Sequence, residues 1–329
     1  MERMMTNTSE RYDLVIAGQG AAGFAAALYA ARYQMKSIVV GGTFGGETAI
    51  GGAIENYPGY VSIDGFDLMM QFKAQAEKYG VPIVDENVAS ITRSGHCSTV
   101  TTTEGQRFQA ATVILAVGRE RRKLGLEHED EWTGRGVSFC STCDAPLHKG
   151  NVVAVVGGGD SAVKGAGLLS KYAKKVYIIY RGAEFRRPEP ANLRALNAAK
   201  NVEQVFNTRV VKLNGTDGLS SIVLDRPVSG STELKVDGLF IEIGANPRKE
   251  LAVELGVALN DKDEVIVDKY MRTNVHGVFA AGDLTDASGE LKQTITAASQ
   301  GALAATSAYA DITAHPSACE IQPMESSRT

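Results

Sequence analysis

Two cysteines separated by two residues, Cys140 and Cys143, are the residues whose types and spacing point most directly to chemistry. Cysteines this close can form a disulfide, and the strained ring and low-pKa thiolate of such a pair suit thiol–disulfide exchange better than structural cross-linking. Asp144 follows directly, where an acid can serve a proton-coupled thiol reaction. The sequence therefore predicts a redox-active cysteine pair with Asp144 as its acid.

The alternative for this pair is half of a zinc site, which would need two more nitrogen or sulfur ligands at suitable spacing. The remaining cysteines, Cys97 in a strand-like stretch and Cys319 in a polar tail, have no second cysteine near them in the sequence. The histidines show no metal-ligand spacing either, and each is expected at the surface or in a turn: His96, His128, His148, His276 and His315. The sequence therefore predicts no metal site.

The length and charge of the chain narrow the classes of protein that it can belong to. A length of 329 residues predicts about two domains, each large enough for its own core. The net charge of -4 provides no broad basic field, so we expect no nucleic-acid partner. The first ten residues lack the apolar run of a signal peptide, and no stretch of 18 uninterrupted apolar residues occurs, so we expect no membrane association. Four cysteines, two of them in one motif, indicate a reducing compartment and a cytoplasmic protein.

A glycine-rich loop lies between an expected strand over residues 12–17 and an expected alanine-rich helix. The loop matches the dinucleotide-binding fingerprint, in which glycines permit a tight turn and let a pyrophosphate approach the backbone at the start of a helix. Its candidate cofactor-binding residues are Gly18, Gly20, Ala21, Ala22 and Gly23. The acid that such a fold places about twenty residues later is missing, because Gly41 and Gly42 follow the strand expected over residues 37–40. Ribose recognition must therefore depend on other residues.

The same pattern of strand, glycine loop and helix returns over residues 151–171, and a further strand is expected over residues 175–180. The candidate cofactor-binding residues of this second loop are Gly157, Gly159, Asp160 and Ser161. Because each such fold binds one nucleotide cofactor, two of them in one chain imply two cofactors.

Arginines rather than a carboxylate follow the last strand of the second pattern. Arg181 stands at the strand end, and Arg186 and Arg187 come a few residues later. Arginine at this place favours the 2′-phosphate of NADP, whereas an NAD-preferring fold places an acid there. The alternative is a set of solvated arginines on a loop, and Glu184 and Glu189 weaken the positive field locally.

An acidic residue, Asp283, follows a buried apolar stretch and precedes a long alanine-rich helix expected over about residues 293–310. A carboxylate beside a helix N-terminus is well placed to accept a hydrogen bond from a ribityl hydroxyl of a flavin. A short strand is also expected over residues 264–267, ahead of this stretch.

The sequence resembles the low-molecular-weight thioredoxin reductases, which are class II FAD-dependent pyridine nucleotide-disulfide oxidoreductases. The resemblance rests on both glycine loops, the Cys-Ser-Thr-Cys-Asp motif of residues 140–144 and the Ala-Gly-Asp of residues 281–283. The resemblance runs from Tyr12 to about Ala310. It implies an α/β fold with two Rossmann-like dinucleotide-binding domains, and a homodimer. It also implies a discontinuous FAD-binding domain of residues 1–118 and 246–329, with an NAD(P)-binding domain of residues 119–245 inserted into it. The local sequence predicts hinges at Gly118, before a charged stretch, and at Gly244, before Asn246 and Pro247.

The resemblance implies roles for individual residues of this chain. The FAD positions would be Gly18, Gly20, Gly23, Gly46, Asn56, Asp283 and Gln293. Cys143 would lie next to the flavin, Cys140 would attack the disulfide of a partner, and Asp144 would be the acid. In the glutathione-reductase-like branch the redox pair follows the first FAD loop, but residues 41–48 contain no cysteine here. One arginine of the family's phosphate-binding pattern is replaced by Gly182, and Arg187 would compensate for it.

The function that the resemblance implies is an NADPH-dependent enzyme that passes two electrons through FAD and the Cys140–Cys143 pair to thioredoxin or a similar small dithiol protein. An enzyme of the same architecture could instead take electrons from ferredoxin or NADH, or could run in reverse as a dithiol oxidase that uses oxygen. A redox-responsive binding protein with a structural flavin is a further hypothesis. The second glycine loop and Arg181 argue against the oxidase, and the complete cysteine and acid set argues against the binding protein.

Overall fold

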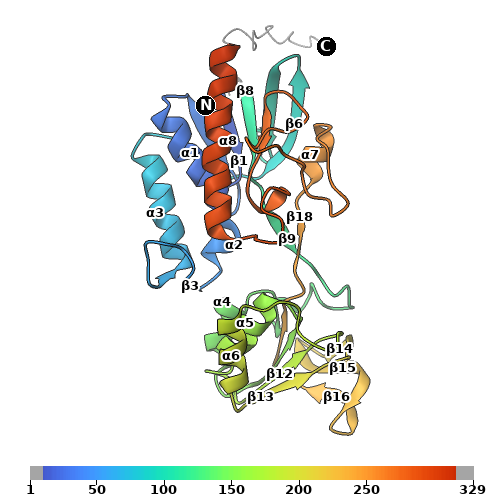
Figure 1. Ribbon diagram of the computed structural model, residues 1–329. Coiled ribbons are helices and arrows are strands. Elements are labelled where there is room, and N and C mark those ends of the chain that lie inside the picture. The colour runs from blue at the N-terminus through green and yellow to red at the C-terminus, as the bar shows by residue number, and fades with distance from the viewer. Residues whose placement is uncertain (1–9, 316–329) are drawn as a thin grey trace, which may run out of the picture. The chain divides into compact units, whose positions relative to one another are not determined.

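The computed structural model describes residues 10–315, which fold as two compact units. The first unit comprises the described residues up to Arg119 and those from Pro247 onward, and the second unit is Glu120–Asn246 (Figure 1). The chain crosses between the units along two strands that pair with each other, β9 (Arg119–Arg121) and β18 (Ala245–Pro247). The second unit is therefore an insertion into the first.

The first unit is built on a seven-stranded sheet with the strand order β5–β2–β1–β8–β7–β6, in which β19 also pairs with β8. The strands are β1 (Glu10–Ala17), β2 (Ser37–Val40), β5 (Ile83–Val84), β6 (Val88–Ser94), β7 (Cys97–Thr102), β8 (Arg107–Leu115) and β19 (Val278–Ala280). Strands β1, β2, β5, β8 and β19 run parallel, and β6, β7 and β8 form an antiparallel meander. A separate small hairpin consists of β3 (Ala53–Ile54) and β4 (Ile63–Asp64).

The helices of the first unit are α1 (Ala21–Arg32), α2 (Gly46–Ala49), α3 (Gly65–Glu77), α7 (Glu250–Glu254) and α8 (Thr294–Ala314), with a short 3-10 turn, η2 (Gly282–Leu284). Helix α8 packs along α1, and α3 lies on the other side of α1 (Figure 1). Small residues permit this close packing, because a Cβ on Gly301 of α8 would lie 2.0 Å from the carbonyl oxygen of Ala22 in α1.

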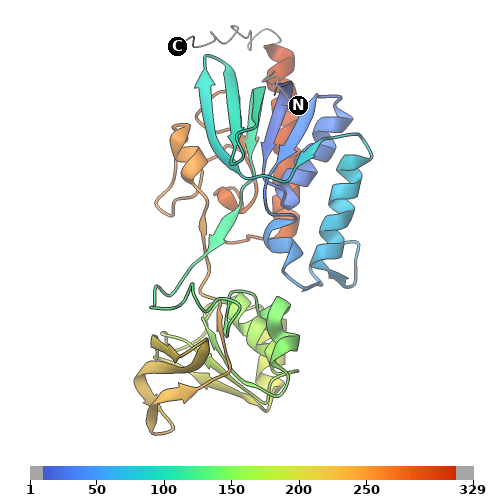
Figure 2. The same cartoon turned by 180° about the vertical axis from the view of Figure 1, so that it is seen from behind.

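Strand β1 is buried on both faces, which explains its continuous apolar sequence. Successive side chains of a strand point to opposite faces. Leu14 and Ile16 join the core cluster with α1 and α8, whereas Val15 and Ala17 join the cluster with the meander and α7. Figure 2 shows the meander side of this unit.

The second unit repeats this design with a five-stranded parallel sheet of order β10–β17–β11–β12–β13. Its strands are β10 (Val137–Ser138), β11 (Val152–Val156), β12 (Lys175–Ile179), β13 (Val202–Val205) and β17 (Gly238–Ile241), and its helices are α4 (Ser141–Asp144), the 3-10 helix η1 (Ala145–His148), α5 (Asp160–Leu169) and α6 (Pro190–Ala198). A three-stranded antiparallel sheet consists of β14 (Val210–Gly215), β15 (Leu219–Val228) and β16 (Ser231–Lys235). Val153 and Val155 of β11 pack against α5, and Ala154 and Val156 join the cluster with β14, β15 and β16.

The predicted α/β fold with two Rossmann-like units is confirmed. The strand predicted over residues 264–267 is wrong, because Val265 forms only isolated bridges with Leu259 and Thr285. The backbone N–H of Val267 donates to the Asp286 carboxylate (3.2 Å) instead of to a neighbouring strand. Within residues 10–315, no helix combines the length and the apolar character needed to cross a membrane. Cys319 lies outside the described residues.

Candidate functional site

The first glycine loop connects β1 to α1 with a backbone that requires glycine. Gly18 has a φ of 122°, and a Cβ there would lie 2.2 Å from the carbonyl oxygen of Ala116. A Cβ on Gly23 would lie 2.0 Å from the carbonyl oxygen of Gly18, so this glycine lets the helix approach the loop. Gly20 is the N-cap of α1, without a side-chain cap and with no atom within 4 Å of a Cβ position. The loop therefore leaves open the helix N-terminus at which a phosphate can bind.

The parallel strands of the first unit end at the edge of the sheet where this loop begins. Ala17 pairs with Val40 and with Leu115, and Leu115 pairs with Ala280. The segments after these residues therefore meet, and they include the glycine loop, the turn after β2 and the η2 turn that carries Asp283. Open parallel sheets bind their ligands at this edge.

The carboxylate of Asp283 is largely removed from solvent at this edge. Burial raises the pKa of Asp283, although the positive charges of Lys292 and Arg119 oppose the rise and Glu47 adds to it. Within residues 10–315, no hydrogen-bond donor reaches this carboxylate. A desolvated acceptor without a donor is costly, so this place favours a ligand that donates a hydrogen bond to Asp283.

A buried glutamine of α8 holds the turn that carries Asp283. Gln300 Oε1 accepts hydrogen bonds from the backbone N–H of Gly282 (2.7 Å) and from the hydroxyl of Thr285 (3.0 Å). Sequence reasoning missed Gln300, because a single polar residue within an alanine-rich helix carries no pattern. Its two hydrogen bonds hold the backbone on either side of Asp283.

Predicted FAD positions that are distant in the sequence lie together. Asn56 Nδ2 donates to Gln293 Oε1 at 3.1 Å. Gln293 is the N-cap of α8 and forms a capping box with Thr296. Gly46 begins α2 next to the first glycine loop, since a Cβ on Gly46 would lie 3.6 Å from the Cα of Gly20. Asn56 is therefore hydrogen-bonded to Gln293, and Gly46 lies beside Gly20.

Side chains from the segment after β5 occupy the place of the missing acid after β2. The backbone N–H of Gly42 donates to Asn87 Oδ1 at 3.2 Å, and Gln19 Nε2 donates to Asp85 Oδ1 at 2.7 Å. Strand β5 pairs with β2, so its following residues reach the end of β2. Asp85 and Asn87 are therefore candidates for ribose recognition that sequence reasoning missed. The sequence signal that could have identified Asp85 is an acid directly after a short parallel strand.

The second glycine loop repeats the geometry of the first. Gly157 has a φ of 149°, and a Cβ there would lie 2.1 Å from the carbonyl oxygen of Glu242. A Cβ on Gly158 would lie 2.4 Å from the ring of Tyr180. Gly159 is the N-cap of α5, without a side-chain cap and with no atom within 4 Å of a Cβ position. This loop also leaves an open helix N-terminus for a phosphate.

The predicted phosphate-binding arginines, Arg181, Arg186 and Arg187, are exposed near this loop. The backbone N–H of Arg186 donates to the carbonyl oxygen of Gly158 at 2.7 Å, which ties the arginine segment to the glycine loop. None of the three guanidinium groups forms an ion pair with a carboxylate of the described part of the chain. They are therefore available to bind an anionic ligand.

Asp160 and Ser161 form the first turn of α5. The Asp160 carboxylate accepts hydrogen bonds from the backbone N–H of Glu189 (2.7 Å) and from Asn192 Nδ2 (3.0 Å), so it fixes the start of α6. Ser161 is exposed. Of these two predicted residues, Ser161 has the side chain that is free to meet a ligand.

The predicted cysteine pair is a disulfide, with the Cα atoms of Cys140 and Cys143 5.4 Å apart. Cys140 is the N-cap of α4, and its Sγ accepts a hydrogen bond from the backbone N–H of Cys143 at 3.1 Å. Such donation at the start of a helical turn stabilises a thiolate. Cys143 is exposed, whereas Cys140 and Asp144 are half-buried. The arrangement can therefore perform thiol–disulfide exchange with an acid adjacent to it.

A carboxylate that sequence reasoning missed, Glu242, fastens the cysteine turn. Its Oε1 accepts a hydrogen bond from the hydroxyl of Ser141 (2.9 Å), and its Oε2 pairs with Arg121 Nη1 (3.1 Å). Arg121 also donates to the carbonyl oxygen of Phe139, directly before the cysteine motif. The Glu242 side chain is only 8% exposed, and its carbonyl oxygen is the atom that Gly157 approaches. Glu242 therefore connects the cysteine turn to the second glycine loop and to β9.

We expect Glu242→Gln to lower the free energy of unfolding of the second unit by about 1–3 kcal/mol, because the Arg121 guanidinium would lose a charged partner at a largely buried position. The rate at which dithiothreitol reduces the Cys140–Cys143 disulfide should change as well, since Ser141 lies between Glu242 and Cys140. Urea unfolding and stopped-flow reduction would measure the two effects.

Glu203→Gln is the matched control, because Glu203 pairs with Lys175 at 2.7 Å in the same unit with both side chains about one-third exposed. An exposed pair of this kind contributes less than about 1 kcal/mol. Equal stability of the two variants would contradict the role of Glu242.

Comparison with known proteins identifies the family of this chain. The family model described as pyridine nucleotide-disulphide oxidoreductase matches residues 12–301. The thioredoxin reductase of Streptomyces coelicolor is 39% identical over 309 residues, which cover 91% of this chain and 94% of that protein. The chain belongs to the thioredoxin reductase family.

Two further comparisons agree with membership in the thioredoxin reductase family. A crystal structure of Lactococcus lactis thioredoxin reductase matches with a TM-score of 0.85 and 33% identity, covering 92% of this chain and 99% of that chain. The bifunctional thioredoxin reductase/thioredoxin of Mycobacterium leprae is 39% identical over 300 residues. That match covers 90% of this chain, and the chain spans 65% of that protein's length.

Thioredoxin reductases are flavoprotein oxidoreductases that use FAD and NADPH. The first unit fits FAD, because it combines an open helix N-terminus at Gly20 with the desolvated Asp283 carboxylate that lacks a donor within residues 10–315. The second unit fits NADPH, because Gly159 is the N-cap of a second open helix N-terminus near Arg181, which forms no ion pair within residues 10–315.

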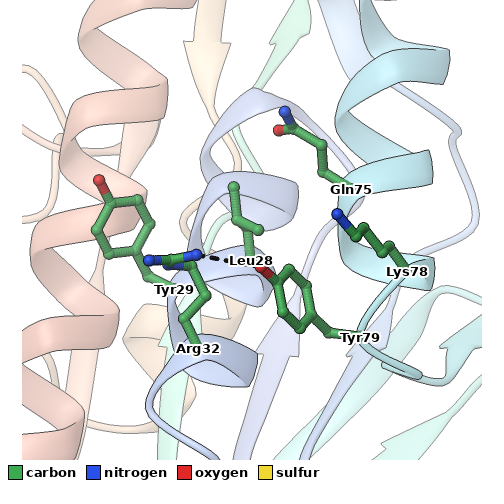
Figure 3. A pocket seen from close by; sticks show the side chains of 6 residues that line it. All are labelled: Leu28, Tyr29, Arg32, Gln75, Lys78 and Tyr79. Atoms are coloured by element: carbon green, nitrogen blue, oxygen red, sulfur yellow. Dashed lines mark hydrogen bonds between the residues drawn. The ribbon is translucent and has the colours of Figure 1, made fainter.

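A pocket of about 340 Å³ lies between α1 and α3 of the first unit (Figure 3). Its lining residues are Leu28, Tyr29, Arg32, Gln75, Lys78 and Tyr79. Arg32 Nη1 donates to the hydroxyl of Tyr79 at 3.1 Å within it. The second half of α1 lines this pocket, whereas the glycine loop precedes the first turn of that helix. It is therefore separate from the candidate cofactor site of this thioredoxin reductase family member.

Proposed function

We propose that this chain transfers electrons from NADPH through FAD and the Cys140–Cys143 disulfide to thioredoxin or a similar small dithiol protein. The disulfide is the observation that carries the proposal, because it lies in the same unit as a glycine loop with exposed arginines near it. The name of the Mycobacterium leprae relative combines a thioredoxin reductase with a thioredoxin, which supports thioredoxin as the partner.

Within this proposal the first unit holds FAD and the second holds NADPH. The residues that would hold FAD are Gly18, Gly20, Gly23, Gly46, Asn56, Asp283 and Gln293. When bound, FAD supplies a centre that accepts two electrons from a nicotinamide and can pass them to a disulfide. The 2′-phosphate of NADPH would bind to Arg181, Arg186 and Arg187.

The cysteine pair performs the exchange with the partner, in two steps that together move two electrons. In the reduced pair, the Cys140 thiolate attacks one sulfur of the partner disulfide and releases the other as a thiolate. Cys143 then attacks the Sγ of Cys140, which releases the second partner thiolate and re-forms the Cys140–Cys143 disulfide. Asp144 provides protons for the leaving thiolates. The partner disulfide is thereby reduced to a dithiol while the pair is oxidised.

We also propose that the two crossings of the chain act as hinges. Gly118 and Gly244 have φ values of 66° and 90°, and no atom lies within 4 Å of a Cβ position at either residue. The backbone can therefore turn at both places without a steric barrier from a side chain. Such a turn would give the disulfide and the nicotinamide alternate access to one flavin.

Anaerobic mixing of the purified flavoprotein with NADPH, NADH or reduced ferredoxin tests the proposed electron path. NADPH should bleach the flavin, and oxidised thioredoxin added afterwards should restore its colour. Bleaching by ferredoxin alone, or no recovery with thioredoxin, would contradict the proposal. A homodimer and a cytoplasmic location also belong to the proposal, and light scattering during gel filtration should give the mass of two chains.

We expect the enzyme to prefer NADPH over NADH by at least about tenfold in kcat/KM, a gap of about 1.4 kcal/mol that one arginine–phosphate contact can supply. Arg181→Ala should remove this preference by lowering kcat/KM for NADPH and leaving that for NADH unchanged. Steady-state kinetics with both nucleotides would measure it.

Arg226→Ala is the matched control, because Arg226 is an exposed arginine of the same unit that lies in β15, outside the glycine loop and the arginine segment. It should keep the preference of the unaltered protein. Equal efficiency with both nucleotides before any substitution would show that the arginines do not bind a phosphate.

A further inference from the structure

Two histidines and one aspartate converge at the C-terminal end of α8 in the first unit. Asp311 lies in the last turn of α8, His315 follows as its C-cap residue, and His276 lies in the loop before β19. His276 Nε2 is 3.0 Å from Asp311 Oδ1. His315 Nδ1 is 3.6 Å from the same oxygen and 3.1 Å from the backbone carbonyl oxygen of Asp311. One candidate ligand atom from each residue lies within 4.8 Å of the other two. One small ion could therefore reach a ligand atom of all three side chains, of which His276 and His315 are exposed.

A third histidine joins this cluster from a different segment. His96, in the turn between β6 and β7, meets the ring of His276 edge to face, with the ring centroids 5.4 Å apart. The rings of His276 and His315 meet in the same way at 5.2 Å. Arg93 of β6 also lies near the loop of His276, since its Nη2 would lie 3.8 Å from a Cβ on Gly277. The rings of His96 and His315 thus limit the orientations of the His276 imidazole.

Helix capping explains only part of the cluster. The backbone N–H of His315 donates to the carbonyl oxygen of Asp311 at 3.0 Å, which is an ordinary end of a helix. A histidine in this place also suits the negative end of the helix dipole, but a carboxylate in the last turn opposes that dipole. Capping therefore accounts for His315, and it accounts neither for Asp311 nor for the approach of His276.

We propose that His276, Asp311 and His315 bind one Zn²⁺ ion, with water as the fourth ligand. Ligand atoms 2.0–2.1 Å from a tetrahedral zinc ion lie about 3.3 Å from one another. The two separations from Asp311 Oδ1, 3.0 and 3.6 Å, bracket this value, and the candidate nitrogen atoms of His276 and His315 lie within 4.8 Å of each other. Two imidazoles and one carboxylate are ligands typical of zinc, whereas Mg²⁺ and Ca²⁺ require mostly oxygen ligands. The ion would fasten the end of α8 to the loop before β19.

Zinc titration of the oxidised, FAD-loaded protein without a histidine tag tests this site. The oxidised form is needed because a reduced Cys140–Cys143 pair would itself bind zinc. Competition with a chromophoric chelator should give one ion per chain. His276→Ala and Asp311→Asn should each weaken binding at least about tenfold. Zinc should also slow amide hydrogen exchange in residues 311–314 of the unaltered protein, and not in these variants.

His128→Ala is the matched control, because His128 Nδ1 pairs with a carboxylate oxygen of Glu131 at 2.9 Å in the second unit without a second histidine beside it. This variant should bind zinc as the unaltered protein does. Saturation below one ion per chain, undiminished affinity in His276→Ala or Asp311→Asn, or an equal loss in His128→Ala would overturn the proposed zinc site.

Discussion

Replacement of either Cys140 or Cys143 by serine is expected to lower thioredoxin reduction at least about 100-fold while NADPH still bleaches the flavin. The exchange needs both sulfurs, since one forms the mixed disulfide with the partner and the other resolves it. Flavin reduction by a nicotinamide uses neither sulfur. Steady-state turnover with thioredoxin and anaerobic bleaching should be measured on the same preparation of each variant.

The two serine variants should differ in their absorption spectra. Cys140→Ser keeps a thiol at Cys143, which the family resemblance places next to the flavin, so its thiolate should produce a long-wavelength charge-transfer band. Cys143→Ser should show no such band. If either variant kept more than a few per cent of the disulfide-reducing turnover, the paired-thiol mechanism would be wrong.

Asp283→Ala is expected to purify largely without colour, because the variant would lose the desolvated acceptor at the edge of the first sheet. A hydrogen bond to a charged group contributes about 1.5–3 kcal/mol, so FAD affinity should fall by about 10- to 100-fold. The ratio of flavin to protein absorbance after purification would measure the loss. Asp283→Asn keeps an acceptor oxygen without the charge and should give an intermediate result.

Asp261→Ala is the control for this experiment, because Asp261 is an exposed aspartate of the same unit in the turn before residue 264. It should remain fully yellow. A fully yellow Asp283→Ala would show that the flavin is anchored elsewhere. Loss of colour from both variants would indicate general instability of the first unit rather than a specific contact.

The two glycine loops and the cysteine pair could be predicted from the sequence because their chemistry is local. Gly18 and Gly157 adopt positive φ within a few residues of the strand and helix that they connect. The spacing of Cys140 and Cys143 brings their sulfurs within bonding reach without help from distant residues. The strands expected before each loop also form, as β1 and β11, and apolar clusters cover both of their faces.

The recognition of the ribose and the flavin could not be predicted in the same way. The acid expected after β2 is absent, and Asp85 and Asn87 reach that place only because β5 pairs with β2. Asn56 and Gln293 are 237 residues apart in the chain, and their hydrogen bond depends on the packing of α8 along α1. The family resemblance predicted Asn56 and Gln293 as FAD positions, but only the fold brings these two residues together.

The sequence by itself determined the chemical identity of the redox pair, the two nucleotide loops and the alternation of strands and helices, since backbone conformation and short spacing depend on neighbouring residues. The tertiary structure decided which distant side chains complete these sites. Strand register places Glu242 beside the cysteine turn, and the position of α8 places Asp311 in contact with His276. Side-chain contacts of this kind follow from the packing of whole elements, which no local pattern of residues encodes.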